Sequence, residues 1–233
     1  MLTSLKSIKQ GFYEVIFPHV CLICGLKLSS SEQFICPVCV RDRFDLANSE
    51  GKQVSSDTIL PEGIALQHAL WNFDKGGFLQ DLLHSLKYHR LTGLGIDLGV
   101  ALGNSVKRNP FFKSSEHSLL IPVPLHPKKR RMRGYNQAKF IAEGVKMATK
   151  IPVCSNEDVQ RIKNTKTQTG FSLEKRRENI GKAFVVKNKD SIKGKECIIV
   201  DDVFTTGATA FELAETLKNS GVIKIMIITV AQA

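Results

Sequence analysis

Several features that would assign this chain to a familiar class of protein are missing from its sequence. No apolar run reaches the ~18 residues that a membrane-spanning helix needs. Lys6 and Lys9 interrupt the segment that a secretory signal would occupy. There is no GxGxxG fingerprint and no P-loop lysine, so neither standard nucleotide-binding loop is predicted. We therefore expect a soluble, cytoplasmic protein, with peripheral association at the inner face of the membrane as the alternative.

Acidic residues are scarce relative to basic ones. The 233 residues include 33 Lys and Arg against 22 Asp and Glu, which gives a net charge of +11. Such a charge favours anionic partners, namely phosphates, nucleic acid or an anionic membrane surface. A basic surface without a dedicated partner is the alternative. The length allows one good hydrophobic core and a small accessory module.

Cysteine is clustered near the N-terminus. Two CxxC pairs stand eleven residues apart: Cys21, Cys24, Cys36 and Cys39. This spacing is typical of a tetrahedral S4 site, usually occupied by structural Zn²⁺, whereas disulfides or redox dithiols are the alternative. Residues 2–16 before it have the apolar periodicity of a helix, which would pack on the body or contact a membrane or partner.

Apolar strands alternate with helical patterns from about residue 64. Strands are predicted at 65–73, 118–125, 183–187, 196–200 and 223–231, and helices at 77–90, 97–108, 136–150 and 207–221. This order predicts an α/β fold with a mostly parallel sheet covered on both faces. Ligands of such sheets bind beyond the carboxyl ends of the strands. A polar stretch at 48–63 predicts two domains, 1–60 and 61–233.

The stretch "CIIVDDVFTTGAT", residues 197–209, carries the strongest chemical signal. A buried strand runs into Asp201 and Asp202, and a turn of small and hydroxylated residues then opens a helix: Thr205, Thr206, Gly207, Ala208 and Thr209. Backbone N–H groups of such a turn bind phosphate, and the carboxylates can accept hydrogen bonds from a vicinal diol. The alternative is that the two acids only offset the helix dipole.

Basic residues follow the strand predicted at 118–125. This segment contains Lys129, Arg130, Arg131, Arg133, Gly134, Tyr135, Asn136 and Gln137. Cations next to a helix N-terminus predict a polyanion site. Nucleic acid, with Tyr135 as a stacking ring, fits the same residues, and a solvated basic loop is the remaining alternative.

A third polar segment, residues 161–184, precedes a predicted strand. Its candidate donors are Arg161, Thr165, Gln168, Arg176, Arg177 and Asn179. Such a segment could close over an anionic substrate. An ordinary helix with a charged face is the alternative interpretation.

The order of these blocks resembles the ComF family of ComFC-like competence proteins. The cysteine pairs, "LHSLKYHR", "RGYNQA" and "VDDVFTTGAT" carry the resemblance, which extends over nearly the whole chain. The last block is similar to the phosphoribosyl-pyrophosphate (PRPP) motif of type I phosphoribosyltransferases. Tyr135 stands where many members have Phe, and Phe171 where many have Leu. The resemblance implies a double zinc ribbon joined to a phosphoribosyltransferase-like domain that acts in DNA uptake during natural transformation.

Two functions follow from this resemblance. In the first, the chain binds PRPP at Asp201, Asp202 and residues 205–209, and binds single-stranded DNA together with the DNA-uptake machinery. In the second, it is an active phosphoribosyltransferase of nucleotide or base salvage. Asp201, Asp202 and Arg133 would then form the catalytic set, with pyrophosphate held at Lys129–Gln137 and Mg²⁺ bound with PRPP. The sequence names no acceptor and no general base.

Overall fold

The computed structural model describes residues 20–28, 34–47, 60–163 and 183–233. The helix expected at 2–16 lies outside these residues, as do the stretch 48–59 and Thr165, Gln168, Arg176, Arg177 and Asn179. The chain divides into two compact units, Met1–Phe44 and Asp45–Ala233. Residues 45–47 pair with the first strand of the second unit, whereas the predicted domain boundary lies at residue 60.

The second unit alternates strands and helices as expected. Its strands are β1 (Ile64–Asn72), β2 (Ser118–Pro122), β3 (Val159–Arg161), β4 (Phe184–Val186), β5 (Glu196–Phe204) and β6 (Lys224–Gln232). Its helices are α3 (Phe78–Tyr88), α4 (Thr92–Lys107), α5 (Pro127–Arg133), α6 (Gln137–Thr149) and α8 (Ala208–Lys218). In the first unit, the helix α2 spans Pro37–Asp42. None of the described helices is long and apolar enough to cross a membrane.

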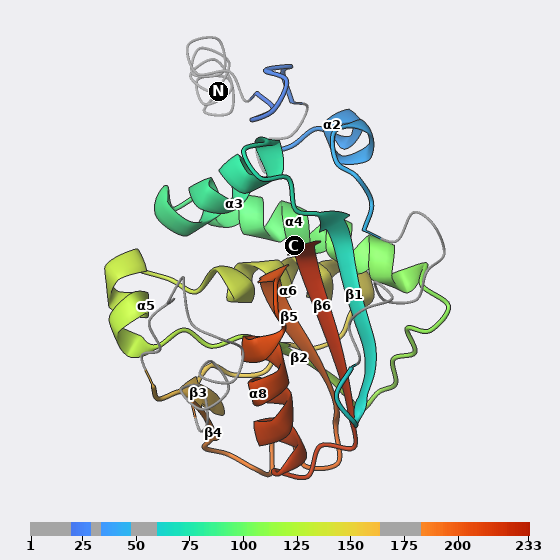
Figure 1. Cartoon of the computed structure of the whole chain (residues 1–233), viewed down its shortest axis with the longest axis vertical. Coiled ribbons are helices and arrows are strands. Elements are labelled where there is room, and N and C mark those ends of the chain that lie inside the picture. The colour runs from blue at the N-terminus through green and yellow to red at the C-terminus, as the bar shows by residue number, and fades with distance from the viewer. Residues whose placement is uncertain (1–19, 29–33, 48–59, 164–182) are drawn as a thin grey trace, which may run out of the picture. The chain divides into compact units, whose positions relative to one another are not determined.

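Four of these strands form one sheet in the order β1-β6-β5-β2 (Figure 1). All neighbours in it are parallel, and Ile199 of β5 pairs with Ile121 of β2 and Ile227 of β6. β3 and β4 form a separate antiparallel pair. The prediction of a mostly parallel sheet is therefore confirmed. Because the strands are parallel, the segments that follow β1, β2 and β5 all leave from the same edge of the sheet.

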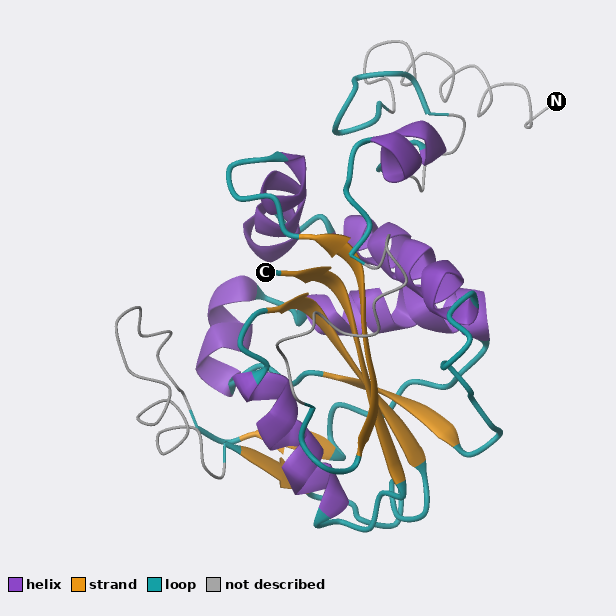
Figure 2. Cartoon of the chain, turned by 45° about the vertical axis from the view of Figure 1, so that its right-hand side comes forward, coloured by secondary structure: helices purple, strands orange, loops and turns teal. Residues whose placement is uncertain are grey.

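Helices cover both faces of the sheet (Figure 2). α4 and α6 pack on one face, and α8 packs on the other. Fully buried Val and Ile side chains from the central strands β5 and β6 fill both interfaces. α4 and α6 approach so closely that a Cβ at Gly99 would lie 2.0 Å from the Ile141 carbonyl oxygen, and one at Gly144 would lie 2.1 Å from that of Ile96. Only glycine fits at these two positions.

Three of the differences from the sequence-based prediction concern elements near the strand ends or the basic segment. β5 continues to Phe204, so Asp201 and Asp202 belong to the strand and do not follow it. The basic residues after β2 form the helix α5, which Pro127 begins and Gly134 ends with a φ of +88°. β3 was not predicted, because three residues are too few to show a strand periodicity.

Candidate functional site

The turn between β5 and α8 opens the helix without a hydrogen bond from a capping side chain. Gly207 is the N-cap of α8 and has a φ of +72°. A Cβ there would lie 2.5 Å from Phe211 and 2.7 Å from Phe204, whose rings meet edge to face. Gly207 has no side chain with which to cap the helix, so the first N–H groups of α8 are not satisfied by it. Thr205 and Thr206 before it are exposed. Ala208 and Thr209 begin the helix and are half-buried.

The two carboxylates of β5 lie next to this turn. Asp202 is only 6% exposed and forms an ion pair with the ammonium group of Lys87 on α3. Asp201 is half-buried, and its Oδ1 accepts a hydrogen bond of 2.9 Å from the backbone N–H of Asp202. α3 follows β1 and α8 follows β5 along the chain. The site is therefore assembled at the carboxyl ends of the parallel strands, as their connectivity predicts.

The two adjacent acids do not carry equal charge. Burial and the neighbouring negative charge of Asp202 raise the pKa of Asp201 well above its ordinary value. Burial acts against ionisation of Asp202 as well, but the Lys87 ammonium and the Arg133 guanidinium hold the pKa of Asp202 below its ordinary value. The surroundings therefore favour the neutral form of Asp201 and the ionised form of Asp202 beside Lys87. A neutral acid next to an ionised one avoids the repulsion between two adjacent carboxylates.

Arg133 lies at the end of α5, and its positive charge acts on the Asp202 carboxylate. It donates a hydrogen bond to Oε1 of Gln137, and its guanidinium lies 5.5 Å from the ring centre of Tyr88. Burial and the charges of Arg161 and Arg133 lower the pKa of Lys129. Arg130 and Arg131 are exposed on α5. α5 thus presents a dense positive charge near the strand ends.

Two other residues of the basic segment are engaged within the protein. The hydroxyl of Tyr135 donates to the Leu86 carbonyl oxygen at the end of α3, and its ring lies edge to face with Phe140. Asn136 is buried: its Nδ2 donates to the Val123 carbonyl oxygen at 2.9 Å, and its Oδ1 accepts from the Ala138 N–H at the start of α6. These contacts fix the path of the chain from β2 to α6.

Arg161 is the one member of the third segment's candidate set that lies within the described residues. Its guanidinium lies 5.3 Å from the ring centre of Phe184 across the β3–β4 pair. Burial lowers its pKa, while the neighbouring carboxyl groups of Asp201 and Glu212 act in the opposite direction. β3 therefore brings a further cation toward the carboxylates of β5.

A cavity of about 630 Å³ opens between α5, the start of α6 and β3. Its lining includes Arg130, Arg131, Tyr135 and Arg161. A second cavity, of about 310 Å³, shares Arg130 and other lining residues with the first. The carboxylates and the 205–209 turn do not line either of them. The basic segment thus faces both the strand ends and a separate concave surface.

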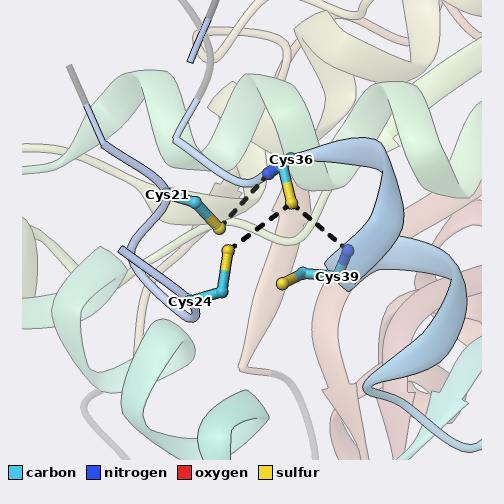
Figure 3. A group of neighbouring side chains, drawn as sticks. All are labelled: Cys21, Cys24, Cys36 and Cys39. Atoms are coloured by element: carbon cyan, nitrogen blue, oxygen red, sulfur yellow. Dashed lines mark hydrogen bonds between the residues drawn. The ribbon is translucent and has the colours of Figure 1, made fainter. Parts of the chain in front are cut away.

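The four clustered cysteines could hold a metal ion (Figure 3). Their sulfur atoms all lie within 4.8 Å of one another, and those of Cys24 and Cys36 are 3.8 Å apart. Tetrahedral Zn–S bonds of ~2.3 Å require sulfur separations of about 3.8 Å. The Cys36 N–H donates to the Cys21 sulfur at 3.4 Å, and all four thiols are free of disulfide bonds. The donor set and its spacing fit such an ion.

The sequence analysis missed one site residue, Lys87. Its signal was weak, because a lysine near the end of an amphipathic helix is normally solvent-exposed. Only its position in the "LHSLKYHR" block set it apart. The pairing with Asp202 depends on where α3 packs, which is a long-range property of the fold.

Comparison with known proteins finds relatives of the chain. Residues 132–233 match the family model of the phosphoribosyl transferase domain. Competence protein F of Haemophilus influenzae is 37% identical over 115 residues, which is 49% of this chain and 50% of that protein. The DNA utilization protein YhgH of Salmonella typhimurium is 27% identical over 90% of this chain and 95% of its own. Competence protein ComFC of Bacillus subtilis is 26% identical over 87% of this chain and 79% of its own.

The chain is similar to competence proteins F and ComFC and in this resembles the ComF family. Its second unit has the mostly parallel sheet of type I phosphoribosyltransferases, and its cysteine cluster fits a zinc-ribbon module. Among solved structures, a glutamine PRPP amidotransferase of B. subtilis aligns with a TM-score of 0.38 and 16% identity, over 58% of this chain and 26% of its own. A purine phosphoribosyltransferase of Pyrococcus horikoshii aligns with a TM-score of 0.34 and 18% identity, over 59% of this chain and 73% of its own.

Proposed function

We propose that this chain acts as ComF proteins do: it binds PRPP or a related phosphoribosyl ligand at the end of β5, binds single-stranded DNA on its basic surface, and acts in DNA uptake. The observation that carries the proposal is the arrangement of Asp201 and Asp202 beside the uncapped start of α8, with Arg133 and Lys87 facing them. The names of its relatives, a competence protein F and a DNA utilization protein, support the role in DNA uptake.

Each part of PRPP has a matching partner in this site. The 5-phosphate would accept hydrogen bonds from the backbone N–H groups of residues 205–209 and from their threonine hydroxyls. The ribose hydroxyls would donate to Asp201 and Asp202. The pyrophosphate would bind next to α5, where Lys129 and Arg133 supply positive charge. Because Asp202 is already neutralised by Lys87, Mg²⁺ would bind mainly to pyrophosphate and ribose oxygens, with Asp201 as the carboxylate left for it.

The cysteine cluster would hold one structural Zn²⁺. A module of this size has too small a core to fold alone, and a metal bound by four thiolates supplies the missing stability. Single-stranded DNA would contact exposed cations, of which Arg130 and Arg131 on α5 are the clearest. Binding one PRPP molecule does not require a net charge of +11. A nucleic-acid strand has many phosphates and can contact many of these cations at once.

The ligand assignment is tested by calorimetric titration with PRPP and Mg²⁺. We expect the double variant Asp201→Asn, Asp202→Asn to lose PRPP binding while its affinity for single-stranded DNA stays nearly intact. The single variant Asp201→Asn is the control for folding, because an amide resembles the neutral carboxyl that the raised pKa of Asp201 favours. Unchanged PRPP binding in the double variant would refute the diol assignment.

A catalysed transfer is the second candidate function. Arg133 and Lys129 lie where they could stabilise departing pyrophosphate, which favours this candidate. Incubation with labelled PRPP and a pool of bases and amines, followed by assay of pyrophosphate release, distinguishes the two. Release that depends on an added acceptor would establish an enzyme, whereas no release together with tight DNA binding would establish a binding protein.

A further inference from the structure

Three rings meet at the exposed end of α3. The rings of His84 and Tyr88 have their centres 4.6 Å apart, and those of His84 and His89 are 5.7 Å apart. All three residues are exposed, and Tyr88 is 62% exposed. Aromatic side chains that remain largely in water give little to the stability of the fold. Their position therefore needs another explanation.

The rings adjoin the proposed ligand site. Lys87, which precedes Tyr88, is paired with Asp202, so the end of α3 is fixed at the strand ends. Arg133 of α5 lies between the rings of α3 and the proposed ligand site. Its guanidinium lies over the Tyr88 ring, and its charge acts on Asp202. A guanidinium next to an exposed phenol ring forms a flat, positively charged surface. We call Tyr88, His84 and Arg133 the α3 ring surface.

We propose that the α3 ring surface stacks an unpaired base of single-stranded DNA, with Tyr88 as the principal ring. This inference rests on the proposed DNA binding and assigns to it a contact with the bases, in addition to the contacts of cations with phosphates. Aromatic side chains and guanidinium planes stack on any base, so the contact would be independent of sequence. Duplex DNA keeps its bases within the helix and would not use this surface.

Charge favours nucleic acid over a protein as the occupant. Arg90 directly follows the rings and is exposed, and α5 adds Arg130 and Arg131. The polymer that offers both unpaired π-faces and closely spaced negative charge is single-stranded nucleic acid. A protein segment would instead need apolar pockets, whereas the α3 ring surface is made of polar rings and a cation.

Tyr88 takes the role that the sequence analysis gave to Tyr135. The hydroxyl of Tyr135 is bound to the end of α3 and its ring packs against Phe140, so Tyr135 holds the two segments together. Both tyrosines lie near Arg133, but only Tyr88 is exposed. The difference arises from packing and is invisible in the order of the residues.

The test compares two oligomers with the same number of phosphates, a dT 12-mer and its abasic analogue. We expect Tyr88→Ala to weaken binding of the dT oligomer about 5- to 150-fold and to leave binding of the abasic oligomer unchanged. The slope of affinity against salt should stay the same, because no phosphate contact is removed. Tyr88→Trp should retain affinity, and its new fluorescence should be quenched by dT.

Matched controls separate stacking from general effects of truncation. Phe78→Ala removes an exposed ring (47%) from the other end of the same helix and should leave both affinities unchanged. Equal loss for the dT and abasic oligomers, or no loss for either, would overturn the inference while leaving DNA binding intact. Quenching of the Tyr88→Trp variant by dTMP as strong as by the oligomer would assign the ring to a free nucleotide and overturn it too. Absence of DNA binding by the unmodified protein would overturn both proposals.

Discussion

Removing the Lys87 ammonium should destabilise the second unit more than removing any exposed lysine. In Lys87→Met, the apolar stem of the side chain stays and the charge is lost, so Asp202 is left buried without its partner. Breaking a buried pair on one side typically costs ~3–5 kcal/mol. The Lys87 side chain is 27% exposed and that of Asp202 is 8% exposed. Solvent at the lysine reduces this cost, and we expect a loss of about 2–3 kcal/mol at pH 7.

Urea unfolding followed by tryptophan fluorescence measures this loss. The single tryptophan, Trp71, is fully buried in β1 and so reports on the sheet. For an m-value of ~2 kcal/mol/M, the midpoint should fall by about 1 M. The matched control is Lys146→Met, which removes an exposed pair with Glu143 on α6 and should change the free energy of unfolding by less than ~0.5 kcal/mol. The double variant Lys87→Met, Asp202→Asn should recover much of the loss, since no buried charge remains.

The pH dependence of the free energy of unfolding is a second test of the Lys87–Asp202 ion pair. In the unmodified protein, the lowered pKa of Asp202 contributes stability that is present above pH 3.8 and is lost as the pH falls through the folded value. Without Lys87, burial of Asp202 raises its pKa with less charge to oppose it, so the destabilisation is largest at pH 7 and shrinks toward pH 5. If Lys87→Met lowers the free energy of unfolding by less than ~0.5 kcal/mol at pH 7, the assignment of the charge to Asp202 is refuted. A loss of the same size at pH 7 and pH 5 would refute it too.

Three further predictions concern the other parts of the site. Freshly purified, reduced protein should contain about one zinc per chain and Cys24→Ser much less, as measured by metal analysis; no zinc in the unmodified protein would contradict the cysteine site. The triple variant Lys129→Ala, Arg130→Ala, Arg131→Ala should flatten the dependence of single-stranded DNA affinity on salt, and an unchanged slope would remove α5 from the DNA path. Gly207→Ala should weaken PRPP binding and lower the free energy of unfolding by ~1 kcal/mol or more, because its Cβ would contact Phe211 and its φ disfavours alanine; normal binding would contradict the phosphate cradle.

Local patterns predicted most of the fold. The strands β1, β5 and β6 and the helices α3, α6 and α8 were expected near their observed positions, because each has a clear apolar periodicity. The parallel sheet followed from their alternation. α5 was missed because a run of cations has no apolar face, although the pair of Pro127 and Gly134 marked its two ends.

The candidate site was predicted in its parts but not in its contacts. The sequence placed Asp201 and Asp202 correctly beside a turn that opens a helix, since both are local features. It did not predict that Lys87 neutralises one of them, or that Tyr135 is turned inward while Tyr88 is exposed. These contacts join segments that are 49 or more residues apart, and they are fixed only by how α3 packs at the sheet edge.

A crystal structure of the chain with PRPP and Mg²⁺ tests the central claim most directly. We predict that the 5-phosphate lies at the start of α8 on the backbone N–H groups of residues 205–209, with the ribose hydroxyls on Asp201 and Asp202 and the pyrophosphate toward Arg133. PRPP bound elsewhere, for example along the exposed cations of α5 with the β5–α8 turn empty, would contradict the account.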